Sequence, residues 1–177
     1  LIARLCSDDP MLTPTPPGHW IEIVVQLAER DSLTVDRTAE AFARTGIAVA
    51  DAFIACWRDK FVFNLVRPIT YIRKHIDPKF EPLLITPPFP EFPSGHSSES
   101  GAAAEALTAM FGDDCAFEDS THAREGLKPR PFKSFWAAAE EAGISRLYGG
   151  IHFRAAIEQG LAQGRCIGKH VAALEMR

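Results

Sequence analysis

The stretch Ser97-Ser-Glu-Ser-Gly-Ala-Ala-Ala-Glu-Ala-Leu-Thr-Ala-Met-Phe111 decides the fold class, because it is long enough for a helix and its side chains are mostly small. Its small residues include Gly101, Ala102, Ala103, Ala104 and Ala106. The distance between packed helices depends on the side chains at their contact, so small residues allow a close approach. We therefore predict a helix from about Ser97 to Phe111 that packs closely against others.

Helical spacing of apolar residues recurs on both sides of this stretch. After residue 18, helical spacing is followed by Trp20, Ile23, Val24 and Leu27, and a longer helix is predicted from about Thr34 to Val66. The apolar stripe of that longer helix is Ala43, Ile47, Ala50, Ile54, Trp57 and Phe61. Because Arg67 precedes a proline, which disfavours helical geometry, the helix should end there.

Two more helices are predicted toward the end of the chain, near Phe135 to Ala142 and from about Ile151 to Met176. Prolines mark residues 1–18 as an irregular lead-in and residues 77–93 as a long ordered loop rather than a linker. Residues 112–133 are polar and loop-like, and no convincing strand pattern is present. We predict an all-α fold: one helical catalytic domain over residues 1–177, with its active site among helix ends and loops.

Composition and charge fit one soluble globular domain. The chain has 177 residues, of which 46% are hydrophobic and 24% are charged. No apolar run approaches the roughly 20 residues that a transmembrane helix needs. The net charge of −4 argues against nucleic-acid binding driven by bulk charge. If the protein binds anions, a local group of cations must do so.

The four cysteines, Cys6, Cys56, Cys115 and Cys166, form no C-x-x-C pair, so we expect free thiols. The first residue is Leu1, and no signal peptide pattern follows it. We therefore expect either a processed form or the C-terminal part of a longer chain. The compartment and the oligomeric state are left open by the sequence.

The first group of chemically interesting residues is Lys60-Phe-Val-Phe-Asn-Leu-Val-Arg67-Pro68. A separation of seven would place Lys60 and Arg67 on one helix face, two turns apart. The guanidinium offers a planar fork to two oxygens of an anion, and the ammonium offers a compact point charge. The plain alternative is a solvated surface that carries two ordinary cations.

The second group is Pro93-Ser94-Gly95-His96, just before the helix of small residues. Gly95 allows the backbone to approach a ligand closely, and a helix start offers free N–H groups to an anion. The Ser94 hydroxyl can donate as well, and His96 can exchange a proton near neutral pH. The plain alternative is a capped helix start with an incidental histidine.

The third group is Ser145-Arg146-Leu-Tyr-Gly-Gly-Ile-His152. Arg146 adds a second guanidinium, and the two glycines suggest a bend that directs His152 inward. Each group alone has an ordinary explanation. Together they supply two guanidinium groups, one ammonium, a helix start and two histidines, which are the components of an oxyanion site with an acid/base.

The order K-x-x-x-x-x-x-R-P, P-S-G-H and S-R-x-x-x-x-x-H resembles the signature of the vanadium-dependent haloperoxidase and type 2 phosphatidic acid phosphatase superfamily. The resemblance covers about residues 40–175. It implies that His152 is the histidine that bonds vanadium or attacks phosphorus, and that His96 is the acid/base. It also implies that the remaining oxygens are bound by Lys60, Arg67, Ser94, Gly95 and Arg146.

One position departs from the family pattern. An aspartate usually stands four residues after the last histidine of the motif, where this chain has Ala156. On a helix, that aspartate would orient the ring of His152. Its loss predicts that a different acceptor orients the ring, or that the ring is held loosely.

Three functions stay open from the sequence. We favour a haloperoxidase that uses vanadate as cofactor and oxidises halide with peroxide, because the chain is expected to be soluble and because Trp57 and Phe89 resemble aromatic neighbours of a vanadate pocket. A soluble acid phosphatase, which needs no cofactor and hydrolyses phosphate monoesters through a phosphohistidine at His152, is a close second. Ala156 motivates the third, an oxyanion-binding module without turnover. The expected partners are small-molecule substrates, namely a phosphate ester or peroxide and halide, and not nucleic acid.

Overall fold

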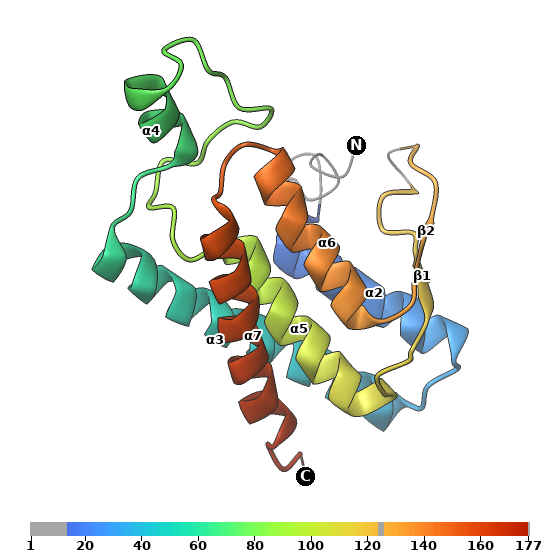
Figure 1. Cartoon of the computed structure of the whole chain (residues 1–177). Coiled ribbons are helices and arrows are strands. Elements are labelled where there is room, and N and C mark those ends of the chain that lie inside the picture. The colour runs from blue at the N-terminus through green and yellow to red at the C-terminus, as the bar shows by residue number, and fades with distance from the viewer. Residues whose placement is uncertain (1–13, 124–125, 177) are drawn as a thin grey trace.

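The computed structural model describes residues 14–123 and 126–176, and most of this part of the chain is helical. The elements in chain order are α2 (Thr15–Arg30), α3 (Val35–Phe63), α4 (Pro68–His75), α5 (Gly95–Phe111), β1 (Phe117–Asp119), β2 (Arg130–Phe132), α6 (Phe135–Tyr148) and α7 (Arg154–Ala172). Helix α5 lies at the centre and packs against α2, α3, α6 and α7 (Figure 1). The predicted all-α bundle is confirmed, and the helix of small residues is its axis.

Helices α5 and α7 run in the same direction and touch through their backbones. Along the contact, Gly160 faces Ser94 and, one turn later, Gly164 faces Ala102. A Cβ atom added at Gly160 would stand 2.8 Å from the Ser94 carbonyl oxygen, and one at Gly164 would stand 2.7 Å from the Ala102 nitrogen. Both distances are too short for a real Cβ contact, so this parallel pair requires glycine on α7.

We expect Gly164→Ala to lower the free energy of unfolding by about 1–3 kcal/mol, because an inserted methyl group would push two helix backbones apart. Gly46→Ala is the matched control. That position also lies inside a helix, but an added Cβ meets nothing within 4 Å. The control should leave stability unchanged or raise it by roughly 0.5–1 kcal/mol through helix propensity. Urea denaturation of both variants makes the comparison, and equal effects would contradict the close contact.

The predicted helical residues of α2 are confirmed as core. Trp20, Ile23, Val24 and Leu27 are all buried, and the indole N–H of Trp20 donates to Ser100 Oγ at 3.0 Å. The helix starts earlier than expected, since residues 15–18 belong to it rather than to an irregular lead-in. Prolines are tolerated in the first turn of a helix, where the missing N–H has no helical partner. Residues 1–13 of the expected lead-in lie outside the described residues.

The apolar stripe expected on α3 is not its buried face, so that expectation is wrong. Ile47, Ile54 and Phe61 are 38%, 67% and 63% exposed. The buried face instead carries small residues such as Ala48 and Ala52, which are fully buried. The reason lies in the close packing at the bundle axis, because a helix that approaches the small residues of α5 must itself present small side chains there.

Two short strands correct the prediction that residues 112–133 contain no strand. β1 and β2 pair antiparallel, with Phe117 opposite Phe132, and the two rings stack with centroids 5.5 Å apart. Each strand has only three residues, which is too short for an alternating sequence pattern to show.

The break after α3 corrects another expectation. The helix ends at Phe63, Asn64 adopts a left-handed conformation with φ 47°, and α4 begins at Pro68. Lys60 and Arg67 therefore do not share a helix face. Residues 77–93 form an ordered loop as predicted, while α6 extends beyond its expected end and α7 stops before Met176.

Two further expectations concern the chain as a whole. Within residues 14–123 and 126–176, no helix combines the length and apolar character that crossing a membrane requires. Cys56, Cys115 and Cys166 are free thiols, as expected, and Cys6 lies outside the described part of the chain.

Candidate functional site

One cavity gathers residues from all three sequence motifs. Arg67 comes from the segment before α4, Gly95 and His96 from the start of α5, and His152 from the segment before α7. The rings of Trp57 and Phe89 complete the wall, with centroids 4.9 Å apart. Lys60, Ser94 and Arg146, the other residues expected at the site, are buried and do not line this cavity.

His152 is held in one orientation. It follows the end of α6, where Gly150 takes a φ of 74° that only glycine adopts without strain, and it is 4% exposed. Its Nδ1 lies 2.8 Å from Glu91 Oε1, which also accepts the backbone N–H of Phe153 at 2.9 Å. Because Oε1 acts as an acceptor, Nδ1 carries the proton and donates it, and Nε2 keeps its lone pair.

The lone pair of His152 points toward positive charge. Nε2 lies 3.0 Å from Nη1 of Arg67. Burial lowers the pKa of His152 well below its ordinary value, and the charges of Arg67, Lys60 and Arg146 lower it further. The imidazole is therefore neutral near pH 7 and presents an unprotonated nitrogen among three cations. Such a nitrogen can bond an electrophilic centre whose oxygens those cations attract.

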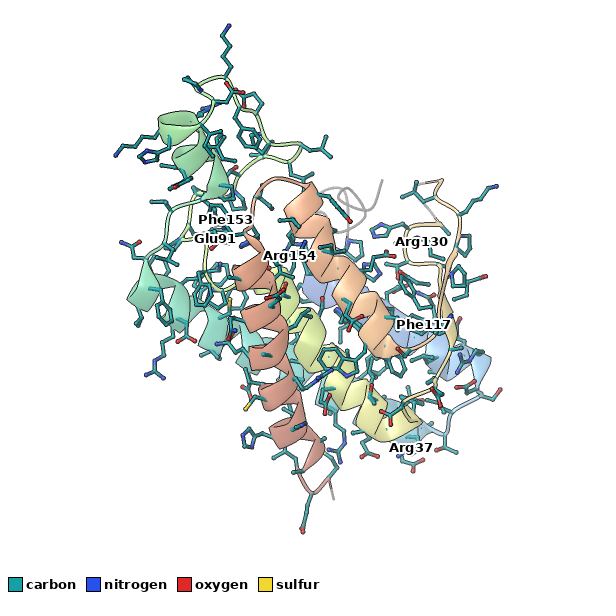
Figure 2. The ribbon with its side chains drawn as sticks, viewed as in Figure 1. Arg37, Glu91, Phe117, Arg130, Phe153 and Arg154 are labelled. Carbon is teal, nitrogen blue, oxygen red and sulfur yellow. The ribbon has the colours of Figure 1, made fainter. Side chains whose placement is uncertain are left out.

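Glu91 accepts the hydrogen bond from His152 that the side chain of Ala156 cannot accept. None of the three sequence motifs includes Glu91. Figure 2 labels it beside Phe153, at the start of α7, and its side chain is buried. Burial raises the pKa of Glu91, while the Phe153 N–H and the charges of Arg67 and Lys60 oppose that rise. One feature of the sequence could have pointed to Glu91, because it is the only acidic residue between positions 82 and 98. The expectation that a different acceptor orients His152 is thus met.

Lys60 has partners other than those expected. Its ammonium donates to three carbonyl oxygens of the proline-rich loop, at 3.0 Å to Pro90, 3.1 Å to Glu91 and 2.5 Å to Pro93. An ammonium has three N–H groups, so all of them are used. Burial, with the charge of Arg67, lowers the pKa of Lys60 to about 8. Lys60 therefore holds the loop that contains Glu91 against α3. It also contributes positive charge close to the cavity, although it does not line it.

The two arginines are fixed by neighbouring groups. Arg67 donates from Nε to the Phe89 carbonyl oxygen at 3.0 Å and from Nη1 to that of Ile151 at 2.8 Å. Its guanidinium also lies over the Phe89 ring, 5.0 Å from the centroid. Arg146 is 1% exposed and donates from Nε to Ser145 Oγ at 2.9 Å. Both guanidinium groups are thus held before any ligand arrives, which is the arrangement that stabilises charge at low cost.

The P-S-G-H segment forms the start of α5. Ser94 is the N-cap, and its Oγ accepts from the Ser97 N–H at 3.4 Å and from Ser97 Oγ at 3.0 Å. The Ser94 N–H donates to the Ala156 carbonyl oxygen at 3.0 Å, which ties the starts of α5 and α7 together. Gly95 and His96 then face the cavity, together with the buried carboxyl residue Glu99.

Comparisons with known proteins identify the family of the chain. Residues 40–177 match the model of the family described as VCPO second helical-bundle domain. Vanadium chloroperoxidase from Curvularia inaequalis is 25% identical over 207 residues, covering 83% of this chain and 34% of that protein.

Two solved structures share the fold. A bacterial vanadium-dependent iodoperoxidase is 49% identical, with a TM-score of 0.91 over 96% of this chain and 42% of its own. The holo form of a bacterial vanadium-dependent chloroperoxidase is 19% identical, with a TM-score of 0.77 over 97% of this chain and 42% of its own, which speaks to the fold alone. The chain spans less than half the length of these relatives. The family model matches well over half of the chain. The chain therefore belongs to the vanadium haloperoxidase superfamily and, within it, to the family described as VCPO second helical-bundle domain.

Proposed function

We propose that this chain is a catalytic domain of a haloperoxidase that binds vanadate and oxidises halide with peroxide. The observation that carries the proposal is the state of His152, whose Nε2 keeps its lone pair beside Arg67 while Nδ1 is held by Glu91. A nitrogen of this kind is a ligand for a metal oxyanion, and the second ring nitrogen is usually fixed by such a carboxylate.

The residues present fit vanadate. The anion would bond Nε2 of His152, which is the metal ligand in this proposal, and its oxygens would face Arg67, the start of α5 at Gly95, and the charges of Arg146 and Lys60. Ser94 supports that helix start as its cap and is a further candidate donor. Bound vanadate would supply the metal centre at which peroxide becomes an oxidant for halide.

The protein's own part is to bind, orient and move protons. Arg67 already contacts Nε2 and is positioned to transfer its hydrogen bond to an anion oxygen. His96 is the group at the cavity wall that can accept and return a proton near neutral pH. Trp57 and Phe89 give the cavity an apolar side that keeps bulk water from the cations and so strengthens their effect.

A phosphatase is the second candidate, and the same observation supports it. Phosphate has the charge and shape of vanadate, and the Nε2 lone pair of His152 could attack phosphorus while His96 protonates the leaving group. The relatives named above are haloperoxidases, and this favours the first proposal. The third possibility, a module without turnover, was motivated by Ala156, and the bond between Glu91 and His152 removes that motive.

One pair of assays separates these proposals. The purified chain, loaded with vanadate, is given peroxide with iodide and then with bromide and chloride, and the vanadate-free protein is given an aryl phosphate. Iodide comes first because the iodoperoxidase shares 49% identity with this chain. We expect peroxide-dependent iodide oxidation that phosphate inhibits. Phosphate hydrolysis without halide oxidation would favour the second candidate, and neither activity together with anion binding would favour the third.

A further inference from the structure

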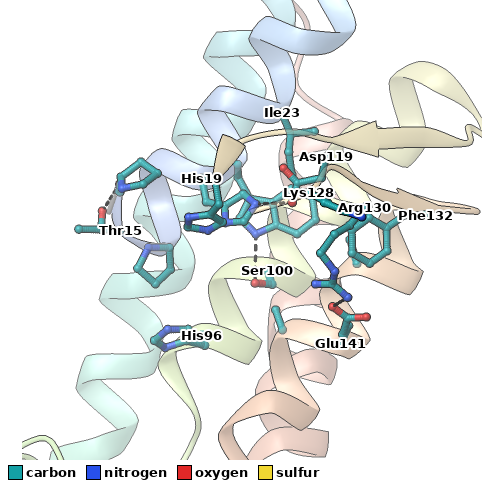
Figure 3. Close-up of a pocket in the computed structure, with 16 residues that line it drawn as sticks. Thr15, His19, Ile23, His96, Ser100, Asp119, Lys128, Arg130, Phe132 and Glu141 are labelled. Atoms are coloured by element: carbon teal, nitrogen blue, oxygen red, sulfur yellow. Dashed lines mark hydrogen bonds and ion pairs between the residues drawn. The ribbon is translucent and has the colours of Figure 1, made fainter. Parts of the chain in front are cut away.

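A second cavity adjoins the candidate site and has a different character. It lies between the start of α2, the β1–β2 hairpin, and α6 (Figure 3). His96 and the α2 residues Thr15 and Pro16 line both cavities, so the two share a wall. The other residues of the second cavity take no part in the proposed function, so a ligand for this cavity has to be considered separately.

Aromatic rings dominate its walls. Trp20, His19, His122 and Phe132 all line it, and the rings of His19 and His122 meet edge to face with centroids 5.0 Å apart. Ala138 and Ala142 of α6 supply a wall of small side chains. A space bounded by several rings and by small aliphatic groups suits a planar aromatic ligand, because ring pairs add stability beyond the area that they bury.

The charges of the cavity leave one cation for a ligand. His19 Nε2 lies 2.8 Å from Asp119 Oδ2, and Arg130 forms an ion pair with Glu141 (Figure 3). Burial opposes ionisation of Asp119, but the hydrogen bond and charge of His19 outweigh it and lower the pKa to about 2. Asp119 is therefore charged and paired with His19, and Glu141 is already paired with Arg130.

Lys128 is the remaining cation. It lines the cavity from its exposed edge, and no residue in the part of the chain that the structure describes hydrogen-bonds or pairs with its ammonium group. A ligand in this cavity would therefore meet aromatic rings at its body and one positive charge at the mouth. A neutral ligand would leave that charge unused, and a cationic ligand would be repelled by it.

We propose that this cavity binds a small aromatic molecule with a single carboxylate or phenolate group, its ring between Trp20 and Phe132 and its anionic group at Lys128. Such a ligand lies on the opposite side of His96 from the oxyanion site. Binding is independent of the function proposed above. If that function holds, hypohalous acid formed next door could halogenate the ring: the carbon–halogen bond forms as the halogen–oxygen bond breaks, the ring loses a proton, and the hydroxide becomes water.

Calorimetric titration with benzoate tests the binding, with cyclohexanecarboxylate as a ligand of equal charge that lacks the aromatic ring. We expect one benzoate site and roughly two- to tenfold weaker binding of the saturated acid. Ala142→Leu, which fills the cavity from α6, should weaken benzoate at least tenfold. Lys128→Gln should weaken it by roughly two- to fivefold, because ion pairs at exposed sites are weak. Lys133→Gln, an exposed lysine outside the cavity, is the matched control and should change nothing.

Saturating phosphate is added as a competitor, because benzoate could instead enter the oxyanion site. Unchanged benzoate binding supports the second cavity, whereas displacement by phosphate would overturn the proposal. No benzoate binding, or equal binding to wild type and Ala142→Leu, would overturn it as well. If Ala142→Leu fails to fold, Lys128→Gln and the phosphate competition decide alone. Because the readout is binding of an organic acid, the result is separable from any failure of vanadate binding or halide oxidation.

Discussion

Replacing His152 by alanine should abolish vanadate binding and reduce peroxide-dependent iodide oxidation by at least about 10³-fold, as expected for a residue that bonds the reacting group. The variant removes the ring nitrogen whose lone pair faces Nη1 of Arg67 at 3.0 Å in this cavity. Vanadium-51 NMR reports the binding, and iodide oxidation reports the turnover. The same variant should abolish any phosphatase activity, because the nucleophile and the metal ligand are one atom.

Substitutions of two other histidines serve as comparisons for His152→Ala. His170→Ala, an exposed residue at the end of α7, should change neither measurement. His96→Ala should slow turnover by roughly 10²–10⁴-fold while leaving vanadate bound, because its proposed role is proton transfer. Normal turnover in His152→Ala would refute the site assignment. Loss of vanadate binding in His96→Ala would show that His96 binds the anion rather than acting as the acid/base.

Replacing Glu91 by glutamine should weaken vanadate binding by roughly 10–100-fold, the usual effect of removing a group that orients a metal ligand. The carboxylate fixes the proton on Nδ1 of His152, and so makes Nε2 the bonding nitrogen. Glutamine keeps the size of the side chain, but its amide has an oxygen and an NH₂ group, so it can also donate to Nδ1 and select the other tautomer.

Glu81→Gln is the matched control for this change. Glu81 belongs to the same loop, but it is exposed and pairs with Arg73 away from the cavity. It should bind vanadate like the wild type. Melting curves of both variants show whether the Glu91 change acts on the site or on the fold. If vanadate affinity is unchanged in Glu91→Gln, the ring of His152 is oriented by something other than the carboxylate charge.

The sequence predicted which motif residues meet at the cavity better than it predicted which groups hold them in place. His96, Gly95, Arg67 and His152 were expected together, and the structure brings them to one cavity. Their motifs could be recognised because each is local, with its residues a few positions apart. Glu91 contacts a residue 61 positions away, and no local pattern can announce a contact of that kind.

The fold followed the same division. The small residues of α5 predicted close packing, and α7 supplies the matching glycines. The face of α3 could not be predicted from its own sequence, because the apolar stripe with Ile54 and Phe61 is regular and the buried face is chosen by the neighbouring helix. Periodicity identifies a helix, whereas the choice of face depends on what packs against it.

The parallel packing of α5 and α7 has a thermodynamic consequence. Two helices that start at the same end place two partial positive charges side by side, here joined by the bond from the Ser94 N–H to the Ala156 carbonyl oxygen. The cations Arg67, Lys60 and Arg146 stand at the same end and all act on His152, so repulsion between like charges is concentrated there. An oxyanion bound at the proposed site would relieve that repulsion in the folded chain, and the unfolded chain would offer it no comparable site. If the proposed site binds an oxyanion, the stability of this domain should rise with the logarithm of the free anion concentration above the dissociation constant.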